Sequence, residues 1–156
     1  MARYDVTSGA TSTGIILNFD SMYVSSGGTA VDITVNPNGY LYVYSGGTAT
    51  NIVWTPCEGH VYVYGGGYAT FASKYSGVYF GSGNKLLSSA AAMDGKTLDP
   101  GYEMYVMKDG TATNATVNEN GYLLVSSGGT AANATVNSGG DLDVHSGGTA
   151  NNTTVM

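Results

Sequence analysis

The stretch that decides the fold is GYLYVYSGGTAT, residues 39–50, because its second half recurs along the chain. SSGGTAVDITVN begins at Ser25, GYLLVSSGGTAANATVN at Gly121 and GDLDVHSGGTANNTTV at Gly140. The anchor of each copy, the alanine of SGGTA, falls at Ala30, Ala49, Ala69, Ala112, Ala131 and Ala150. The intervals are 19, 20, 43, 19 and 19 residues, and a fixed period of this kind predicts a repeat architecture.

Two weaker copies complete the series. Ser12 occupies the anchor position 18 residues before Ala30. The 43-residue interval spans about two units, and SSAAAMDGKTLDPGY near Ala91 resembles a decayed copy. We therefore expect eight units along the chain.

Within each unit, apolar and polar residues alternate with the period of a β-strand. Leu41 and Val43 precede the glycine turn of the third copy, and Ile52 and Trp54 follow its alanine. Each unit should supply two short strands with one apolar face, which only stacking on neighbouring units can bury. The sequence predicts an all-β fold, a parallel β-solenoid of about 19-residue coils forming a single domain over residues 1–156.

Aspartate or asparagine stands two residues after most anchors, at Asp32, Asn51, Asn114, Asn133 and Asn152. Equivalent residues of stacked coils lie about 4.8 Å apart. Because these side chains suit tight turns and can hydrogen-bond along a stack, we expect a ladder at one corner of the coil.

Composition excludes several classes of function. Five Lys and Arg residues against eleven Asp and Glu give a net charge of −6, and the basic residues do not cluster, so nucleic acid is not an expected partner. No apolar run reaches the roughly 18 to 20 residues that span a bilayer, so we expect no membrane insertion. The first residues lack a charged leader followed by an apolar stretch, so no signal peptide is expected in this chain.

The pattern V-x-SGGTA-xx-(A/T)-TV-N-xx-G-x-L-x-V resembles the AIDA-type repeat of bacterial autotransporter passenger domains and related secreted adhesins. The match covers residues 5–72 and 101–156, the expected regular coils, and is poor over 73–100, the expected irregular insertion. The resemblance implies a right-handed parallel β-helix at the bacterial cell surface or outside the cell. It also implies adhesion or self-association, with a host-cell receptor, a glycan or sister adhesin molecules as partners and homo-oligomers as an option.

The resemblance further implies O-glycosylation, because protein heptosyltransferases modify hydroxyl groups on AIDA-type repeats. The candidate hydroxyls of the SGGT motifs are Ser26, Thr29, Ser45, Thr48, Ser127, Thr130, Ser146 and Thr149. Serine and threonine are equally suited to turns, so sequence alone leaves both roles open.

Catalysis would need converging acids, bases or nucleophiles, and the candidates are scattered. His60 and His145 occupy different positions in distant coils, and Asp141 and Asp143 suit a polar terminal coil. Cys57 has no orienting group beyond its neighbours. We predict a protein that is not an enzyme, with no catalytic residue, metal site or cofactor.

Tyrosines occupy the outward positions between the apolar residues. The candidate binding residues of this outer aromatic face are Tyr23, Tyr40, Tyr42, Tyr44, Tyr62, Tyr64 and Tyr105. An exposed aromatic patch is typical of a binding surface, whereas tyrosine is also simply favoured on strands. Both interpretations remain open at this stage.

Residues 73–100 are the part of the chain that the repeat does not dictate, and they include Lys74, Lys85 and Lys96. NKLLSSAAAM, residues 84–93, predicts a short helix. The segment is either a functional insertion or a junction between two arrays. Two other classes of protein stay as alternatives: a structural fibre or phage-tail-type solenoid, and a polysaccharide-acting β-helix enzyme with a carboxylate cluster on one face.

Overall fold

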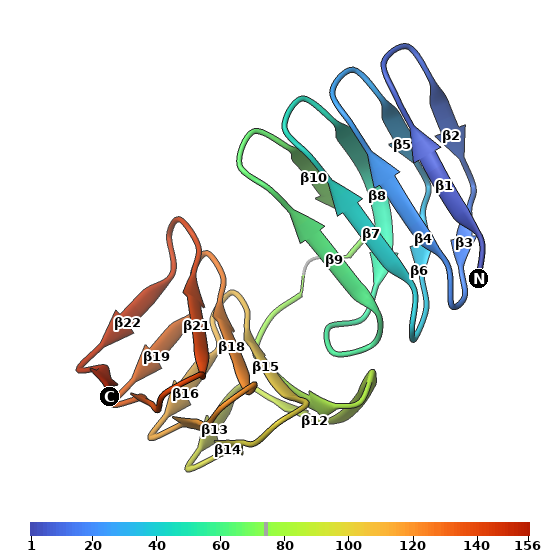
Figure 1. The fold of residues 1–156 in the computed structure, drawn as a ribbon. Coiled ribbons are helices and arrows are strands. Elements are labelled where there is room, and N and C mark those ends of the chain that lie inside the picture. Colours follow the sequence, from blue (N-terminus) through green and yellow to red (C-terminus); the bar gives the residue numbers. More distant parts are fainter. Residues whose placement is uncertain (74) are drawn as a thin grey trace. The chain divides into compact units, whose positions relative to one another are not determined.

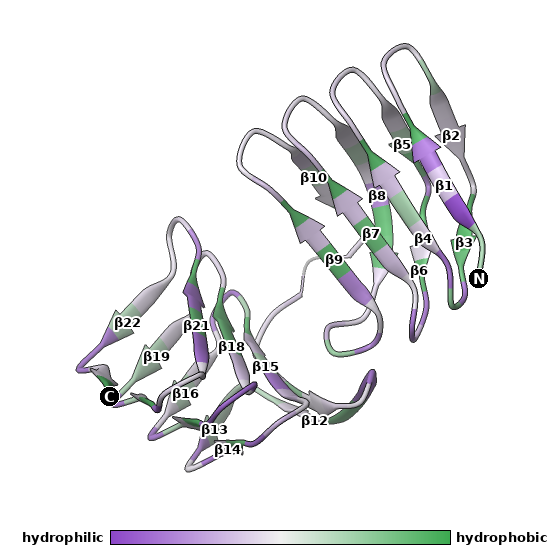
Figure 2. Ribbon diagram, in the orientation of Figure 1, coloured by the Kyte–Doolittle hydropathy of each residue, from purple (hydrophilic) through white to green (hydrophobic). Residues whose placement is uncertain are grey.

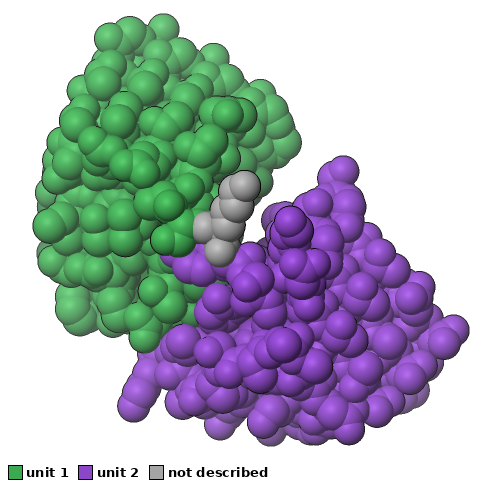
Figure 3. All heavy atoms as spheres, turned by 180° about the vertical axis from the view of Figure 1, so that it is seen from behind, with its two compact units in different colours: residues 1–74 green, residues 75–156 purple. Residues whose placement is uncertain are grey.

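The computed structural model describes residues 1–73 and 75–156, which form mostly parallel strands stacked as in a β-solenoid and contain no helix (Figure 1). The predicted fold class is therefore confirmed. The chain divides into two compact units, Met1–Lys74 and Tyr75–Met156, which Figure 3 colours separately. Among the described residues no helix is present that could cross a membrane.

Unit 1 contains four coils. Its strands are β1 (Arg3–Val6), β2 (Thr11–Thr13), β3 (Ile16–Leu17), β4 (Ser21–Val24), β5 (Thr29–Val31), β6 (Thr34–Val35), β7 (Tyr40–Val43), β8 (Thr48–Trp54), β9 (His60–Val63) and β10 (Tyr68–Phe71). Parallel pairing joins β1, β4, β7 and β9 into one sheet, and β2, β5, β8 and β10 into the next. The register places Ser12, Ala30, Ala49 and Ala69 opposite one another, as the repeat predicts.

Unit 2 also contains four coils, preceded by a hairpin. Its strands are β11 (Val78–Ser82), β12 (Lys85–Ala90), β13 (Ala92–Asp94), β14 (Thr97–Leu98), β15 (Tyr102–Val106), β16 (Thr111–Thr113), β17 (Thr116–Val117), β18 (Tyr122–Val125), β19 (Thr130–Ala132), β20 (Thr135–Val136), β21 (Asp141–Val144), β22 (Thr149–Asn151) and β23 (Thr154–Val155). Met93 lies opposite Ala112, so the decayed copy is a true coil whose anchor is Met93.

Most coils have three strands, where the sequence predicted two. The additional corner lies at the Asp or Asn two residues after the anchor, which adopts a left-handed conformation: φ is 55° at Asp32 and 52° at Asn114. Asp and Asn tolerate this conformation better than other residues with a side chain. The corner separates β5 from β6 in unit 1, and in unit 2 it separates the sheet of β13, β16, β19 and β22 from the sheet of β14, β17, β20 and β23.

The apolar residues predicted to face inward form the core. Leu41, Val43, Leu123 and Val125 are fully buried, and Figure 2 shows the alternation of hydrophobic and polar residues along β4, β7 and β9. In the last coil of each unit, the equivalent Val63 and Val144 are each 41% exposed.

The helix predicted over residues 84–93 is wrong. These residues lie mostly in β12 and β13, and β12 pairs antiparallel with β11, which pairs antiparallel with β15. A ten-residue run is too short to hold a helix by propensity alone, so pairing with an adjacent sheet decides its conformation. Lys74, part of the predicted insertion, lies outside the described residues.

Candidate binding surface

The sheet β1, β4, β7 and β9 places the outward aromatic residues of unit 1 in three columns along the solenoid axis. The middle column contains Tyr23, Tyr42 and Tyr62, which lie opposite one another in adjacent strands. One side column contains Ser21, Tyr40 and His60. The other contains Ser25, Tyr44 and Tyr64, whose alignment follows from two hydrogen bonds: Tyr44 N donates to Val24 O, and Tyr64 N donates to Val43 O. We call the seven rings of these columns the tyrosine face.

The rings of the tyrosine face stack on one another between coils. Ring centroids are 4.8 Å apart for Tyr23 and Tyr42, and 5.2 Å for Tyr42 and Tyr62. Tyr44 and Tyr64 stack at 5.0 Å with planes 3° apart, and Tyr40 stacks on His60 at 5.1 Å. Because the coil spacing of about 4.8 Å is close to the preferred separation of stacked rings, the backbone repeat itself aligns them.

This stacking determines what the tyrosine face presents to solvent. Inner rings such as Tyr42 have their flat faces covered by neighbouring rings, so their edges and hydroxyl groups point outward. Tyr44, Tyr62 and Tyr64 are the more exposed, at 37%, 38% and 45%. The prediction that Tyr40, Tyr42, Tyr44, Tyr62 and Tyr64 share one face of adjacent coils is confirmed by the register.

An ion pair lies at the first coil of this sheet. The Arg3 guanidinium donates to both carboxylate oxygens of Asp5, at 2.8 and 2.9 Å for the closest contacts, and lies 4.2 Å from the Tyr23 ring centroid. The hydrogen bond from Arg3 lowers the pKa of Asp5. Partial burial raises the pKa of Tyr42, with neighbouring phenols adding to the effect.

Tyr105 differs from the other predicted binding residues. It belongs to unit 2, is 6% exposed, and contacts Tyr122 edge-on at 6.1 Å, so it adds no exposed ring to the tyrosine face. His60, by contrast, is a member that the tyrosine prediction omitted. Its position five residues before the turn, the same as that of Tyr40, is a signal that could have identified it.

The candidate glycosylation serines lie in the turns after β4, β7, β18 and β21, and the candidate threonines begin the strands that follow, β5, β8, β19 and β22. Ser26, Ser45, Ser127, Ser146 and Thr149 are exposed, whereas Thr29, Thr48 and Thr130 are half-buried. Ser26 and Ser127 pack against the first glycine of the next SGG motif: a Cβ on Gly46 would lie 2.6 Å from Ser26 Oγ, and one on Gly147 would lie 2.5 Å from Ser127 Oγ. The exposed serines are therefore the more accessible candidates.

The predicted ladder of Asp and Asn residues forms at the corner after the second sheet. Asn51 Nδ2 donates to Asp32 Oδ1 at 2.6 Å, whereas Asn133 Nδ2 lies 3.5 Å from Asn114 Oδ1. Sequence reasoning missed a second ladder at the next corner, in which Asn118 Nδ2 donates to Asp99 Oδ1 at 2.7 Å and Asn137 Nδ2 to Asn118 Oδ1 at 2.6 Å. Its signal was the asparagine that follows TV in three copies, at Asn36, Asn118 and Asn137.

The remaining chemical candidates are His60, Cys57 and the pair His145 and Asp143. His145 Nε2 lies 3.5 Å from Asp143 Oδ2, both on exposed side chains of unit 2, whereas His60 belongs to unit 1. Cys57 is buried. Within residues 1–73 and 75–156, no group of three or more His, Cys, Asp or Glu residues could hold a metal ion.

Comparisons with known proteins agree with the repeat. Residues 90–140, about a third of the chain, match the AIDA family model, described as "Adhesin of bacterial autotransporter system, probable stalk". The match begins inside the segment where the resemblance was expected to be poor, in keeping with the coil anchored at Met93. Comparison with curated proteins gives no match.

A solved structure, "Crystal structure of TibC-catalyzed hyper-glycosylated TibA55-350 fragment", is similar at 27% identity and a TM-score of 0.41. The alignment covers 98% of this chain, which spans 66% of the length of that one. The family match and the register of the coils confirm the AIDA-type repeat that the SGGTA pattern predicted.

Proposed function

We propose that this chain is a segment of a bacterial surface or secreted adhesin, without enzymatic activity, that contacts its partner through the tyrosine face. The observation that carries the proposal is the set of seven stacked rings on one sheet of a solenoid with an AIDA-type repeat. Partly exposed aromatic rings that are held rigid provide contact area with little loss of conformational entropy on binding. Adhesion to a host-cell receptor or glycan, or association with sister molecules, would use this surface.

The interpretation of tyrosine as a strand-favoured residue accounts less well for its distribution. In unit 2 the positions equivalent to the middle column hold Tyr105, Leu124 and Asp143 in successive coils. The same coil therefore folds with leucine or aspartate at these positions. Since the scaffold does not require tyrosine there, its concentration in unit 1 favours a role in binding.

Removing two rings of the tyrosine face while the fold is retained tests the proposal. The variant Tyr42→Ala with Tyr64→Ala, displayed on bacteria that lack other adhesins, should reduce both cell adhesion and autoaggregation severalfold. Leu124→Ala, at the equivalent outward position of unit 2, is the matched control and should change neither. Unchanged adhesion and aggregation by a tyrosine variant with a normal circular dichroism spectrum would show that the tyrosine face is not the contact surface.

We also propose that the exposed SGGT serines are acceptors for a protein heptosyltransferase. Exposure of Ser26, Ser45, Ser127 and Ser146 at a corner of the coil supports this proposal, since a transferase needs access to the hydroxyl. Coexpression with such a transferase should add heptose units in the intact mass spectrum. Serine-to-alanine replacement at these four positions should remove most of the addition, and an unmodified wild-type protein would contradict the proposal.

A further inference from the structure

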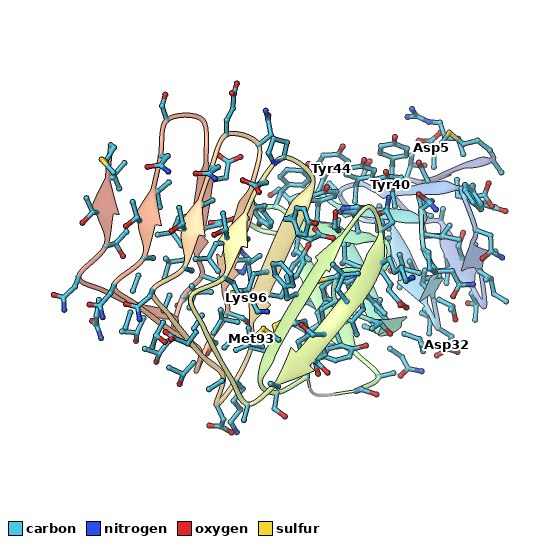
Figure 4. The ribbon with its side chains drawn as sticks, turned by 90° about the horizontal axis from the view of Figure 1, so that it is seen from below. Asp5, Asp32, Tyr40, Tyr44, Met93 and Lys96 are labelled. Atoms are coloured by element: carbon cyan, nitrogen blue, oxygen red, sulfur yellow. The ribbon has the colours of Figure 1, made fainter. Side chains whose placement is uncertain are left out.

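Tyr44 and Tyr64 form one side column of the tyrosine face, where each directly follows a strand of the same sheet. β7 and β9 pair in parallel, so the two rings lie in adjacent coils, and they stack with their centroids 5.0 Å apart and their planes 3° apart. Tyr44 is 37% exposed and Tyr64 is 45% exposed. Figure 4 shows Tyr40 and Tyr44 on one side of unit 1, with Asp32 on the opposite side. Two phenols that solvent reaches are therefore held in contact by the backbone.

Other neighbouring tyrosines combine contact and exposure less well. Tyr42 is half-buried and has a ring on each face, Tyr23 at 4.8 Å and Tyr62 at 5.2 Å. In unit 2, Tyr105 is 6% exposed and meets the Tyr122 ring edge-on at 6.1 Å. An oxidant in solution therefore has better access to the side column than to the middle column or to the pair in unit 2.

Contact between two phenols favours one particular reaction, radical coupling. A phenol that loses one electron and its hydroxyl proton becomes a phenoxyl radical, whose unpaired electron is shared with the two ring carbons next to the oxygen-bearing carbon. Two such radicals join through one of these carbons each, and the hydrogens displaced from the new carbon–carbon bond return to the oxygens. Because both radicals must meet within their lifetime, rings already held 5.0 Å apart couple in preference to rings that have to diffuse together.

Coupling at this place would join the last coil of unit 1 to the coil before it. β9 is the terminal strand of its sheet, and Val63 at its end is 41% exposed, whereas Val43 in β7 is fully buried. A terminal coil opens more readily than an inner coil, because fewer contacts hold it. A covalent bond between two residues that are 20 positions apart in the sequence restricts this opening.

We propose that Tyr44 and Tyr64 are an oxidative cross-linking site, at which hydrogen peroxide and a haem peroxidase convert the two side chains to dityrosine. The peroxidase takes one electron and one proton from each phenol, and hydrogen peroxide accepts both electrons and both protons and leaves as two molecules of water. The product contains one new carbon–carbon bond, has lost two hydrogen atoms, and holds the last coil of unit 1 to the third coil. The reaction needs no binding partner at the tyrosine face.

Oxidation of the full chain at low protein concentration tests the site. Hydrogen peroxide and a haem peroxidase should give monomers with dityrosine fluorescence, a mass lower by two hydrogen atoms, and a peptide map that joins Tyr44 to Tyr64. Tyr64→Phe retains a ring for stacking but has no phenol to oxidise, so it should lose most of the fluorescence. Tyr122→Phe in unit 2 is the matched control and should keep the wild-type yield. In the oxidised wild-type protein, amide hydrogen exchange in β9 should slow at least about tenfold.

The contrary outcomes are equally definite. Monomers without dityrosine, in a reaction mixture that couples free tyrosine, would overturn the site. The same conclusion would follow from links that form between chains alone and increase with protein concentration, or from a full yield in Tyr64→Phe with a normal circular dichroism spectrum. A peptide map that joins Tyr42 to Tyr62 would assign the reaction to the middle column instead. Cross-linked protein whose β9 amides exchange at the unmodified rate would refute the effect on the last coil.

Discussion

The two units build the same coil and differ on its outer surface. Leu41 in unit 1 and Leu123 in unit 2 occupy the same inward position and are fully buried. The adjacent outward residues are Tyr42, which stacks between two tyrosines, and Leu124, which lies between Tyr105 and Asp143. One scaffold thus supports an aromatic surface in unit 1 and a mixed surface in unit 2.

This difference distinguishes the residues that the coil needs in order to fold from the outward residues that determine its surface. Inward residues and corner glycines are restricted by neighbouring coils on both sides. Outward side chains pack on one another within and between columns, so their identity can change without disturbing the core. A property shared by both units therefore belongs to the scaffold, and a property of one unit belongs to its surface.

The largest expected effect concerns a glycine that both units share. A Cβ on Gly47 would lie 2.5 Å from Val24 O, and one on Gly129 would lie 2.4 Å from Val106 O, both backbone atoms of the preceding coil. Gly47→Ala and Gly129→Ala should each lower the free energy of unfolding by about 3 kcal/mol, because the coils must separate to admit the methyl group. Urea denaturation measures both changes.

Gly65 provides the control for these substitutions. It occupies the serine position of the fourth copy, and a Cβ there would meet no atom within 4 Å. Gly65→Ala should be neutral or stabilise by up to about 1 kcal/mol through the unfolded chain. Equal losses from Gly65→Ala and Gly47→Ala would show that contact between coils is not the cause.

The next effect should distinguish the two outer surfaces. Tyr42→Ala removes two ring-stacking contacts and should cost about 2 kcal/mol. Leu124→Ala removes a half-buried side chain without stacked neighbours and should cost less than about 1 kcal/mol. Thermal unfolding by circular dichroism compares them, and similar costs for the two variants would mean that stacking adds no stability to the tyrosine face.

Much of the scaffold could be predicted from sequence because its causes are local and repeated. The apolar alternation around Leu41 and the spacing of the SGGTA anchors fixed the strands, the inward residues and the stacking. The third strand of most coils was not predicted, because it depends on a left-handed corner at residues such as Asp32, which the alternation does not reveal. The hairpin of β11 and β12 was not predicted, because the strand that pairs antiparallel with β11, β15, lies outside residues 73–100.

The candidate site could be predicted in part. The side that each tyrosine occupies follows from alternation, and the shared face of Tyr42 and Tyr62 follows from the repeat. The ion pair of Arg3 and Asp5 beside the Tyr23 ring did not follow, because it depends on side-chain orientations in two neighbouring coils. No single copy of the repeat contains such a feature.

A smaller effect compares the corner ladders. Asn51 bonds to the Asp32 carboxylate at 2.6 Å, whereas the Asn133 amide lies 3.5 Å from that of Asn114. Asn51→Gly preserves the left-handed corner and removes only the side chain, so it should cost about 1 kcal/mol, and Asn133→Gly should cost less. Urea midpoints measure the pair, and a larger loss from Asn133→Gly would mean that the charged bond is not the stronger one.

The smallest effect compares two exposed carboxylates. Hydrogen bonds lower the pKa of both Asp5 and Asp94, but the donor to Asp5 is the charged Arg3, and the donors to Asp94 are neutral: Thr113 Oγ1 at 2.5 Å and Asn114 Nδ2 at 2.7 Å. Because each pKa is lower in the folded state, each contribution to stability is present above the unfolded pKa of about 3.9 and is lost as the pH falls through the folded value.

A high salt concentration should change the pKa of Asp5 more than the pKa of Asp94. At 1 M salt the screening length is about 3 Å, so the exposed ion pair weakens and the pKa of Asp5 should rise toward its ordinary value. The pKa of Asp94 should change less, because its hydrogen-bond donors carry no net charge. Carboxyl ¹³C titrations at 0.1 M and 1 M NaCl measure both pKa values. Equal shifts would mean that the charge of Arg3 is not what lowers the pKa of Asp5.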